Sequence, residues 1–379
     1  MMKKIAILGS TGSIGTQALE VISENSDIFK VYAVSCEKNI ERLCGQIEKF
    51  SPEIAVTASE KDALMLSKRY RATEFLFGDE GLARAAEAGC DVVLNGLMGI
   101  RGLLPTYRAV LAGKDIAFAN KETLVAGGKI IMSAVKKRKA RFVPVDSEHS
   151  AFLQCLSGNS MSKVKRLILT TSGGPFRGRS REELNDVTVE QALAHPKWNM
   201  GSKITVDSAT MMNKGLEIIE AKWLFDMPED RIDVAVHPQC IVHSMVEYLD
   251  GAVMAQLGKP DMRTPISYAL GYPTRLVSGA SALDIFNDGP LTFEKPDEDT
   301  FICMKLARQA IKDEDSSYPV VLNAANEILV QQFLEGRIKF TDIQDNIERE
   351  LFEHKPEHGL DIDQVLMLDK AVKNRVLRK

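Results

Sequence analysis

The 379-residue sequence predicts an α/β protein with an N-terminal doubly wound parallel sheet, a central α+β domain and a C-terminal helical bundle. Three observations support this prediction. Short apolar runs alternate with amphipathic stretches over the first third of the chain, longer strands with glycine-rich turns follow from Lys165, and helical periodicity dominates near the C-terminus. We therefore expect domains at 1–146 and 147–282, a linker at 283–299 and a helical domain at 300–379.

Composition excludes several classes of protein. The 48 basic and 52 acidic residues give a formal net charge of -4, which provides no broad attraction to nucleic acid or to an anionic membrane. Apolar runs stay well short of the roughly eighteen residues needed to span a bilayer, and the six cysteines form no CxxC pair. We therefore expect a cytoplasmic protein with reduced thiols and with no nucleic-acid or membrane partner.

The first predicted strand, at 5–8, leads into a glycine-rich turn at 9–15 that opens a helix. The spacing is GxxGxxG. Glycines let the backbone approach a pyrophosphate, which the N–H groups at the helix N-terminus then stabilise. A glycine turn without a ligand is the alternative, but the position between a strand and a helix favours a Rossmann-like dinucleotide site.

The remaining strands of the N-terminal sheet are predicted at 31–34, 54–56, 92–94, 116–119 and 142–145. The strand at 31–34 ends without the acid that commonly binds the ribose 2′-hydroxyl of NAD. Lys38 and Asn39 follow shortly and can hold a 2′-phosphate, which favours NADPH. Glu37 lies beside them, and its charge opposes that preference.

Polar residues also follow the strand at 116–119. Ligands of parallel sheets bind at the carboxyl ends of the strands, so these residues are candidates for ligand contact. Asn120, Lys121 and Glu122 can face the nicotinamide half of a cofactor, or they can form an ion pair that starts a helix. The sequence leaves both interpretations open.

Two acidic stretches suggest a divalent metal site. Asp146 and Glu148 are expected on a strand, whose side-chain period of two points both to the same side. Asn213 and Glu217 share one face of a predicted helix, with Lys214 alongside. Three carboxylates without a nearby Cys or His pair suit Mg²⁺ or Mn²⁺ better than zinc. The alternative is that all three acids are solvated surface charges.

The central domain is expected to contain strands at 166–171, 203–206, 234–236, 244–248 and 252–256. Asp250 and Gly251 form the turn of a hairpin between the last two. This sheet is also a candidate oligomer interface. In the C-terminal domain, Val321, Ala325 and Phe333 lie on one apolar helix face.

Two loops are candidates for anion binding. The turn at 170–175 contains small hydroxyl residues and glycines that can wrap an anion, although many such turns bind nothing. Ser208 is a candidate N-cap for the helix that carries Asn213 and Lys214. The loop at 195–201 contains His195 and Trp198, and it is either a lid over a ligand or a segment packed on the core.

Eight motifs together identify a resemblance to a known family. They are GSTGSIG at 9–15, ANKE at 119–122, PVDSEHSA at 144–151, TSGGPF at 171–176, HPKWNMG at 195–201, VDSATMMNKGLE at 206–217, HPQCIVHSM at 237–245 and LGKPDMRTPI at 257–266. With these motifs the chain resembles the 1-deoxy-D-xylulose 5-phosphate reductoisomerases over essentially its whole length.

The resemblance implies a homodimer that uses NADPH and Mg²⁺ or Mn²⁺, with Co²⁺ as a further option. The implied reaction is a metal-assisted rearrangement of the phosphorylated ketose 1-deoxy-D-xylulose 5-phosphate, followed by hydride transfer from NADPH. Its product is 2-C-methyl-D-erythritol 4-phosphate, in the non-mevalonate route to isoprenoid precursors. A retro-aldol and an α-ketol route both satisfy the same residues.

The resemblance also implies roles for individual residues by matching position. The implied metal ligands are Asp146, Glu148 and Glu217, which with Lys121 form the catalytic set. The implied substrate-binding residues are Ser147, Glu148, Ser172, His195, Trp198, Met200, Ser208, Asn213, Lys214 and Glu217. The implied cofactor-binding residues are Thr11, Gly12, Ser13, Ile14, Glu37, Lys38, Asn39, Asn120, Lys121, Glu122 and Gly201.

Two positions depart from the family pattern: Glu37 replaces a small residue and Cys240 replaces a serine. Two other functions are considered. A metal-independent dehydrogenase of the semialdehyde or homoserine type would share the nucleotide domain but would not need three carboxylates. A non-catalytic dinucleotide sensor would never consume NADPH. Dependence of NADPH oxidation on a divalent metal and a phosphorylated ketose separates these functions from the reductoisomerase.

Overall fold

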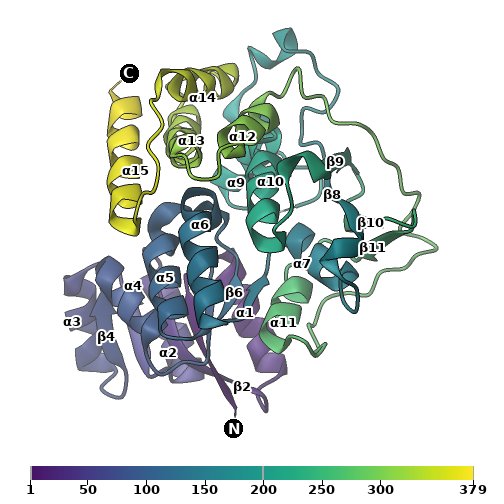
Figure 1. Cartoon of the computed structure of the whole chain (residues 1–379). Helices are drawn as coiled ribbons and strands as arrows, with labels where there is room; N and C mark the ends of the chain where they lie inside the picture. Colours follow the sequence, from purple (N-terminus) through teal and green to yellow (C-terminus); the bar gives the residue numbers. More distant parts are fainter. Residues whose placement is uncertain (1, 199, 379) are drawn as a thin grey trace. The chain divides into compact units, whose positions relative to one another are not determined.

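The computed structural model describes residues 2–198 and 200–378, which form two compact units (Figure 1). Unit 1 contains Met1–Thr123, Ile130–Ser150 and Asp261–Ser281, and unit 2 contains Leu124–Lys129, Ala151–Pro260 and Ala282–Lys379. Within the described part of the chain, no helix is long and apolar enough to cross a membrane. The division into three domains that the sequence suggested remains a prediction.

Unit 1 is built on a parallel sheet. Its strands are β1 (Lys3–Leu8), β2 (Phe29–Ser35), β3 (Ile54–Thr57), β4 (Glu74–Phe77), β5 (Val92–Asn95), β6 (Asp115–Phe118) and β7 (Phe142–Pro144). The described residues place these seven strands in the order β4-β3-β2-β1-β5-β6-β7. The chain moves outward from β1 to β4 and then returns to β5, so the direction of winding reverses between β1 and β5. Ligands bind at the carboxyl ends of the strands beside such a reversal.

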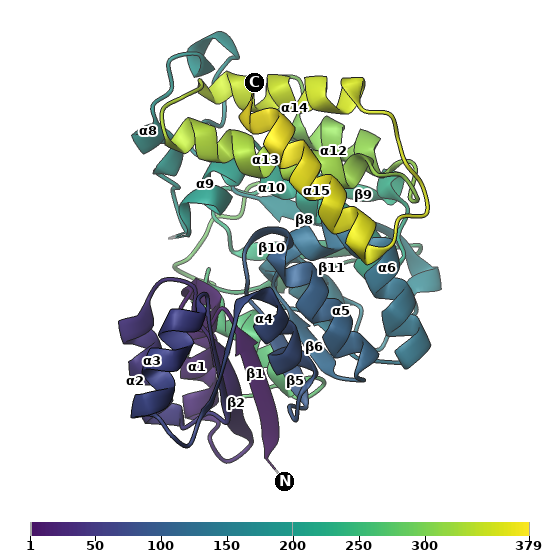
Figure 2. The same ribbon diagram turned by 90° about the vertical axis from the view of Figure 1, so that its left-hand side faces the viewer.

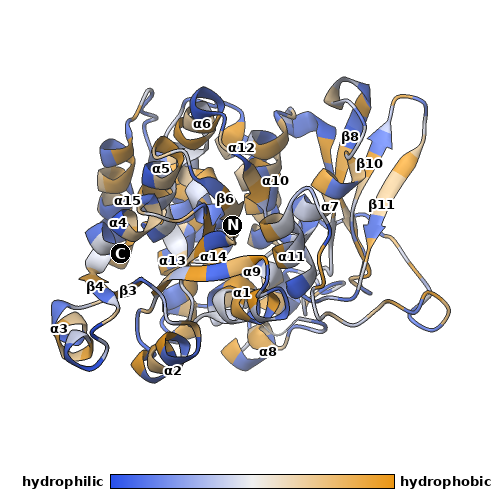
Figure 3. Ribbon diagram, turned by 90° about the horizontal axis from the view of Figure 1, so that it is seen from below, coloured by the Kyte–Doolittle hydropathy of each residue, from blue (hydrophilic) through white to orange (hydrophobic). Residues whose placement is uncertain are grey.

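Helices cover both faces of this sheet, as the sequence predicts for a doubly wound fold. The helices are α1 (Ser13–Glu24), α2 (Ile40–Phe50), α3 (Glu60–Arg69), α4 (Gly78–Glu87), α5 (Leu103–Leu111), α6 (Lys121–Arg138) and α11 (Arg263–Gly271). Helix α7 (Ser147–Cys155) begins in unit 1 and continues in unit 2, where Phe152 shares a core with Leu167 and Val246. On one face α4 packs against α5, and on the other α1 packs against α11 (Figures 2 and 3). Strand β1 is buried from Ile5 to Leu8, as expected for a central strand.

Unit 2 contains a mixed sheet and a set of helices. Its strands are β8 (Val164–Thr171), β9 (Ile232–Val236), β10 (Val242–Tyr248) and β11 (Val253–Leu257), in the order β11-β10-β8-β9. Its helices are α8 (Val189–Leu193), α9 (Ser202–Ala209), α10 (Met212–Phe225), α12 (Cys303–Ile311), α13 (Tyr318–Leu334), α14 (Phe340–Glu353) and α15 (Ile362–Leu377). The predicted hairpin is confirmed, with Gly251 at a φ of +87° between antiparallel β10 and β11.

Unit 2 is held together by helices α9, α10, α12 and α13. The predicted apolar face of α13 is confirmed, because Val321, Ala325 and Phe333 are buried. They share one core with Met212 and Leu216 of α10. The helices near the C-terminus therefore pack directly against the helix that carries the candidate site residues.

The predicted strand at 203–206 is wrong, because these residues lie within α9. The β-branched residues there favour a strand locally. The observed helix buries Thr205 and Val206, and it aligns Lys203 with Asp207 one turn later, with Nζ and Oδ2 2.8 Å apart. Tertiary packing and this ion pair therefore override local propensity.

Candidate functional site

The glycine turn after β1 forms a tight backbone cradle at the N-terminus of α1. Gly9 has a φ of +81°, and a Cβ built on Gly15 would lie 2.3 Å from the carbonyl oxygen of Gly9. Both positions therefore require glycine. Among the described residues no side chain caps α1 at Gly12, and the first turn after Ser13 contains no acid. Its N–H groups are thus available to an anion.

The residues after β2 form a polar group beside this cradle. Asn39 caps α2 by accepting a hydrogen bond from the backbone N–H of Arg42 (2.9 Å). The Arg42 guanidinium donates to the carbonyl oxygen of Thr11 (2.9 Å). Arg42, which the sequence motifs did not single out, therefore joins the exposed Lys38 as a second positive charge near the glycine turn.

Asn120 and Glu122 lie at the start of α6 and are almost fully buried. Asn120 caps the helix through the backbone N–H of Thr123, and its amide nitrogen donates to the carbonyl oxygens of Leu97 and Gly99 (2.9 Å each). Asn120 therefore holds the loop after β5 in place. Contact of these residues with a cofactor remains a prediction.

Four predicted catalytic and substrate residues lie together at the ends of β6 and β7. The Nζ atom of Lys121 is 3.0 Å from Oδ2 of Asp146. The other oxygen of Asp146 accepts a hydrogen bond from the backbone N–H of Glu148 (3.2 Å), and the Ser147 hydroxyl donates to the Glu148 carboxylate. Unit 1 thus supplies two carboxylates beside a buried ammonium group.

The expectation that Asp146 and Glu148 occupy a strand is wrong. Strand β7 ends at Pro144 and α7 begins at Ser147. Asp146 precedes the helix and binds the backbone N–H of its second residue. The two carboxylates converge because Asp146 forms an N-terminal cap, not because they share a strand face.

His149 is a neighbour that the site prediction missed. It is fully buried, and its Nδ1 atom lies 3.8 Å from Oδ1 of Asp146. The three-residue spacing on a helix was the signal in the sequence that could have identified it.

In unit 2, Ser172 and His195 form a hydrogen-bonded pair with Oγ and Nε2 2.9 Å apart. The Nδ1 atom of His195 accepts hydrogen bonds from the backbone N–H groups of Lys197 (3.2 Å) and Trp198 (2.9 Å). The ring hydrogen must therefore lie on Nε2, which donates to Ser172. The Ser172 hydroxyl hydrogen remains available to donate to a phosphate oxygen.

The turn after β8 also brings Ser208 to this pair. Gly174 has a φ of +70°, and a Cβ built on it would lie 2.7 Å from the carbonyl oxygen of Ser208. The predicted N-cap role of Ser208 is wrong, because Ser208 lies in the last turn of α9. Met211, with a φ of +61°, lies between α9 and α10, interrupts the helical conformation and occupies the N-cap position of α10.

Helix α10 carries the third predicted carboxylate. Glu217 accepts hydrogen bonds from both Asn213 and Lys214, so the three side chains share one face as predicted. Lys214 is 2% exposed and Glu217 is 1% exposed. Burying an ion pair costs desolvation energy that an apolar pair of similar size would avoid. The buried pair is therefore weak evidence for a gain in stability.

The loop before α9 is the predicted lid. Trp198 and Met200 are partly buried, Gly201 is the N-cap of α9, and Asn199 lies outside the described residues. The centroid of the Trp198 ring lies 6.4 Å from the ring centroid of His243, a buried residue that the site prediction missed. The Trp198 ring therefore lies near β10.

The loop should respond to pH through His195. Burial lowers the pKa of this imidazole from its ordinary value of 6.5, so the neutral form is favoured. Protonation of Nδ1 would remove the two hydrogen bonds that it accepts from the backbone N–H groups of Lys197 and Trp198. The ordered loop is therefore stable above pH 6.5 and is lost as the pH falls through the lower, folded-state pKa.

We expect Trp198 fluorescence in a Trp223→Phe background to change reversibly as the pH falls below 6.5, through the lowered pKa of His195. The change should be absent when His195→Gln is added. His354→Gln is the matched control, because burial also lowers the pKa of His354. An unchanged pH profile in the His195 variant would contradict the assignment.

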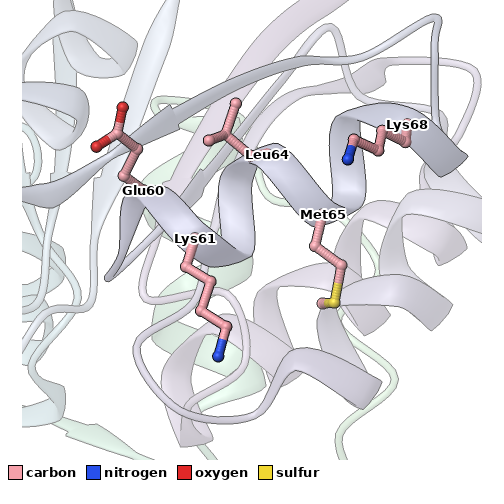
Figure 4. A pocket seen from close by; sticks show the side chains of 5 residues that line it. All are labelled: Glu60, Lys61, Leu64, Met65 and Lys68. Atoms are coloured by element: carbon pink, nitrogen blue, oxygen red, sulfur yellow. The ribbon is translucent and has the colours of Figure 1, made fainter.

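A shallow hollow along α3 lies apart from these clusters (Figure 4). Its lining consists of Glu60, Lys61, Leu64, Met65 and Lys68, all from one exposed helix. It offers neither a glycine turn nor a group of carboxylates, so it does not resemble a cofactor or metal site.

Comparison with known proteins identifies the family of this chain. The family model described as 1-deoxy-D-xylulose 5-phosphate reductoisomerase matches residues 5–128. Models of the C-terminal domains of this enzyme match residues 142–225 and 257–375. The chain belongs to the 1-deoxy-D-xylulose 5-phosphate reductoisomerase family. The resemblance inferred from the motifs is thereby confirmed.

Relatives in this family match over their full length. The reductoisomerase of Thermoanaerobacter pseudethanolicus is 50% identical over 380 residues, which cover 100% of this chain and 99% of the relative. That of Geobacter sp. strain M21 is 51% identical over 372 residues, which cover 97% and 96%. The metal-independent dehydrogenase considered above does not account for such matches.

Solved structures of the family confirm the predicted fold class. The Zymomonas mobilis reductoisomerase in complex with NADPH has a TM-score of 0.93 and 39% identity, and the match covers 100% of this chain and 99% of that one. A reductoisomerase in complex with NADPH, fosmidomycin and magnesium has a TM-score of 0.93 and 38% identity, covering 100% and 98%.

Proposed function

We propose that this chain converts 1-deoxy-D-xylulose 5-phosphate to 2-C-methyl-D-erythritol 4-phosphate, using NADPH and a divalent metal. The full-length similarity to reductoisomerases, at 50% identity, carries this proposal. The two predicted clusters of charged residues supply the groups that such a reaction needs. The product serves the non-mevalonate route to isoprenoid precursors.

The residues present fit NADPH. The glycine turn leaves no room for a Cβ at Gly15, and the N-terminus of α1 can stabilise a pyrophosphate. Lys38 and Arg42 add positive charge near the ribose position. When bound, NADPH supplies the hydride.

The residues also fit a hard divalent cation. Asp146, Glu148 and Glu217 provide only carboxylate oxygens, which Mg²⁺ and Mn²⁺ prefer. From their positions in the family motifs, we propose that these three residues hold one ion. When bound, the metal acts as a Lewis acid that stabilises negative charge on the substrate oxygens.

The protein's own side chains orient the reactants. Lys121 fixes the Asp146 carboxylate, 3.0 Å away. In unit 2 the donors of Ser172, Ser208, Asn213 and Lys214 bind the substrate phosphate, and His195 orients the Ser172 hydroxyl. Phosphate binding draws the loop containing Trp198 over the substrate and excludes water. Binding energy from the substrate phosphate, which is remote from the reacting carbons, thus helps to fix the geometry of the reaction.

The function can be tested by following NADPH absorbance with 1-deoxy-D-xylulose 5-phosphate, with and without a chelator. We expect oxidation only when substrate and divalent metal are both present. NADPH oxidation that survives complete chelation would favour a metal-independent dehydrogenase.

We also propose that the protein is a homodimer that pairs through β11. This strand is at the edge of its sheet and shows Val253, Met254 and Leu257 to solvent, 52%, 44% and 39% exposed. Figure 3 shows the hydrophobic colouring of part of β11. An exposed apolar edge strand invites pairing with a second chain.

Met254→Lys should weaken dimerisation at least about tenfold, because a charge would be buried at the interface. Sedimentation velocity over a dilution series measures this effect. Met65→Lys on α3 is the matched control, since Met65 is 53% exposed. Unchanged association of the Met254 variant would contradict the proposed interface.

A further inference from the structure

Three charged residues gather at the carboxyl edge of the sheet in unit 1. The Nη1 atom of Arg101 lies 3.3 Å from Oε1 of Glu37. Its Nε and Nη2 atoms lie 3.0 and 2.9 Å from Oδ1 of Asp79, at the start of α4. Asp79 therefore anchors the guanidinium while it reaches Glu37.

The strand order shows what this ion pair spans. Glu37 follows β2, and Arg101 belongs to the short 3₁₀ turn Gly99–Gly102 that follows β5. Strand β1 lies between β2 and β5. The pair therefore extends across the carboxyl end of β1, from which the glycine turn emerges. In this fold that edge binds the adenosine half of a dinucleotide.

An acid shortly after the second strand has a defined effect on cofactor choice. Such a carboxylate accepts a hydrogen bond from the ribose 2′-hydroxyl of NAD, and it repels the 2′-phosphate of NADP. Glu37 is placed for the first role, yet its carboxylate is engaged by Arg101. Lys38 and Arg42 lie beside it with the charge that a phosphate needs.

We propose that Arg101 is a specificity-determining residue that pairs with Glu37, reduces its repulsion of a phosphate and thereby lets this site accept the 2′-phosphate of NADPH in preference to NADH. Arg101 acts through Glu37, so it is a positioning residue and not a catalytic one. The inference rests on the proposed use of NADPH.

The test measures the dissociation constants of NADPH and NADH by calorimetry, without substrate. Arg101→Met keeps the side-chain length and removes the charge. We expect NADPH binding to weaken about tenfold and NADH binding to stay within about twofold, because only NADPH brings a charge next to Glu37. Arg101→Lys should retain most of the preference, since it keeps a positive charge.

The double variant Glu37→Gln with Arg101→Met should restore most of the NADPH affinity, because the unpaired carboxylate is then absent. Failure of this rescue would show that Arg101 contacts the phosphate directly and would overturn the proposal. The loss in the single variant should also shrink at high ionic strength.

Arg108→Met is the matched control, because Arg108 forms a comparable ion pair with Glu87 (2.6 Å) on α5 and α4. It should leave the NADPH to NADH ratio unchanged. A wild-type protein that oxidises neither nucleotide with 1-deoxy-D-xylulose 5-phosphate would contradict the proposed function. Wild-type and Arg101→Met proteins with equal NADPH affinity would contradict only the role of Arg101.

Discussion

Glu217→Gln is expected to lower turnover at least about a thousandfold with saturating NADPH, substrate and Mg²⁺. The change removes one proposed anionic metal ligand at constant size. Glu217 is 1% exposed and lies on the same helix face as the proposed phosphate ligands Asn213 and Lys214. Its loss should weaken Mg²⁺ binding as well as turnover, which calorimetry measures independently of activity.

Glu350→Gln is a matched control for this experiment. Glu350 is also 1% exposed and paired with a cation, with its Oε2 atom 2.8 Å from Nε of Arg375. The control should lose stability but keep its turnover and its affinity for Mg²⁺. Full activity of the Glu217 variant at ordinary metal concentration would refute the metal assignment.

Local sequence patterns predicted the parts of the site that depend on a single element. The glycine turn needs a strand before it and a helix after it, and both are adjacent in the chain. Asn213, Lys214 and Glu217 depend only on helical periodicity, and they share a face as expected. Such features are encoded within a few residues.

Features that depend on distant contacts were missed or wrong. Arg101 reaches Glu37 only because β5 lies two strands from β2 in the folded sheet. Residues 203–206 have strand propensity, but burial in the core of unit 2 makes them helical. In each case the deciding interaction joins elements that are not neighbours in the sequence.

The contact between the C-terminal helices and the region of the proposed phosphate ligands is another feature that joins distant parts of the sequence. Asp207, next to Ser208 on α9, accepts a hydrogen bond from the buried amide of Asn326 on α13 (2.8 Å). This contact ties the end of α9 to a helix more than a hundred positions later in the chain. The C-terminal helices thus support the proposed phosphate site without contributing a predicted ligand to it.

Lys214→Met should raise KM for the phosphorylated substrate roughly a hundredfold and lower kcat as well. As a proposed phosphate ligand, this buried ammonium group would supply binding energy, and part of that energy would close the loop containing Trp198. Steady-state kinetics with NADPH absorbance measures both constants. The affinity for inorganic phosphate should fall in parallel.

The Lys214 variant also leaves the Glu217 carboxylate without its ion-pair partner, so some loss of stability is expected. Comparison with 1-deoxy-D-xylulose, which lacks the phosphate, separates this effect from binding. The wild type should strongly prefer the phosphorylated ketose, whereas Lys214→Met should lose most of that preference. Lys222→Met, two turns further along α10 and paired with Glu314, should keep it. A Lys214 variant that still discriminates between the two ketoses like the wild type would show that Lys214 has only a structural role.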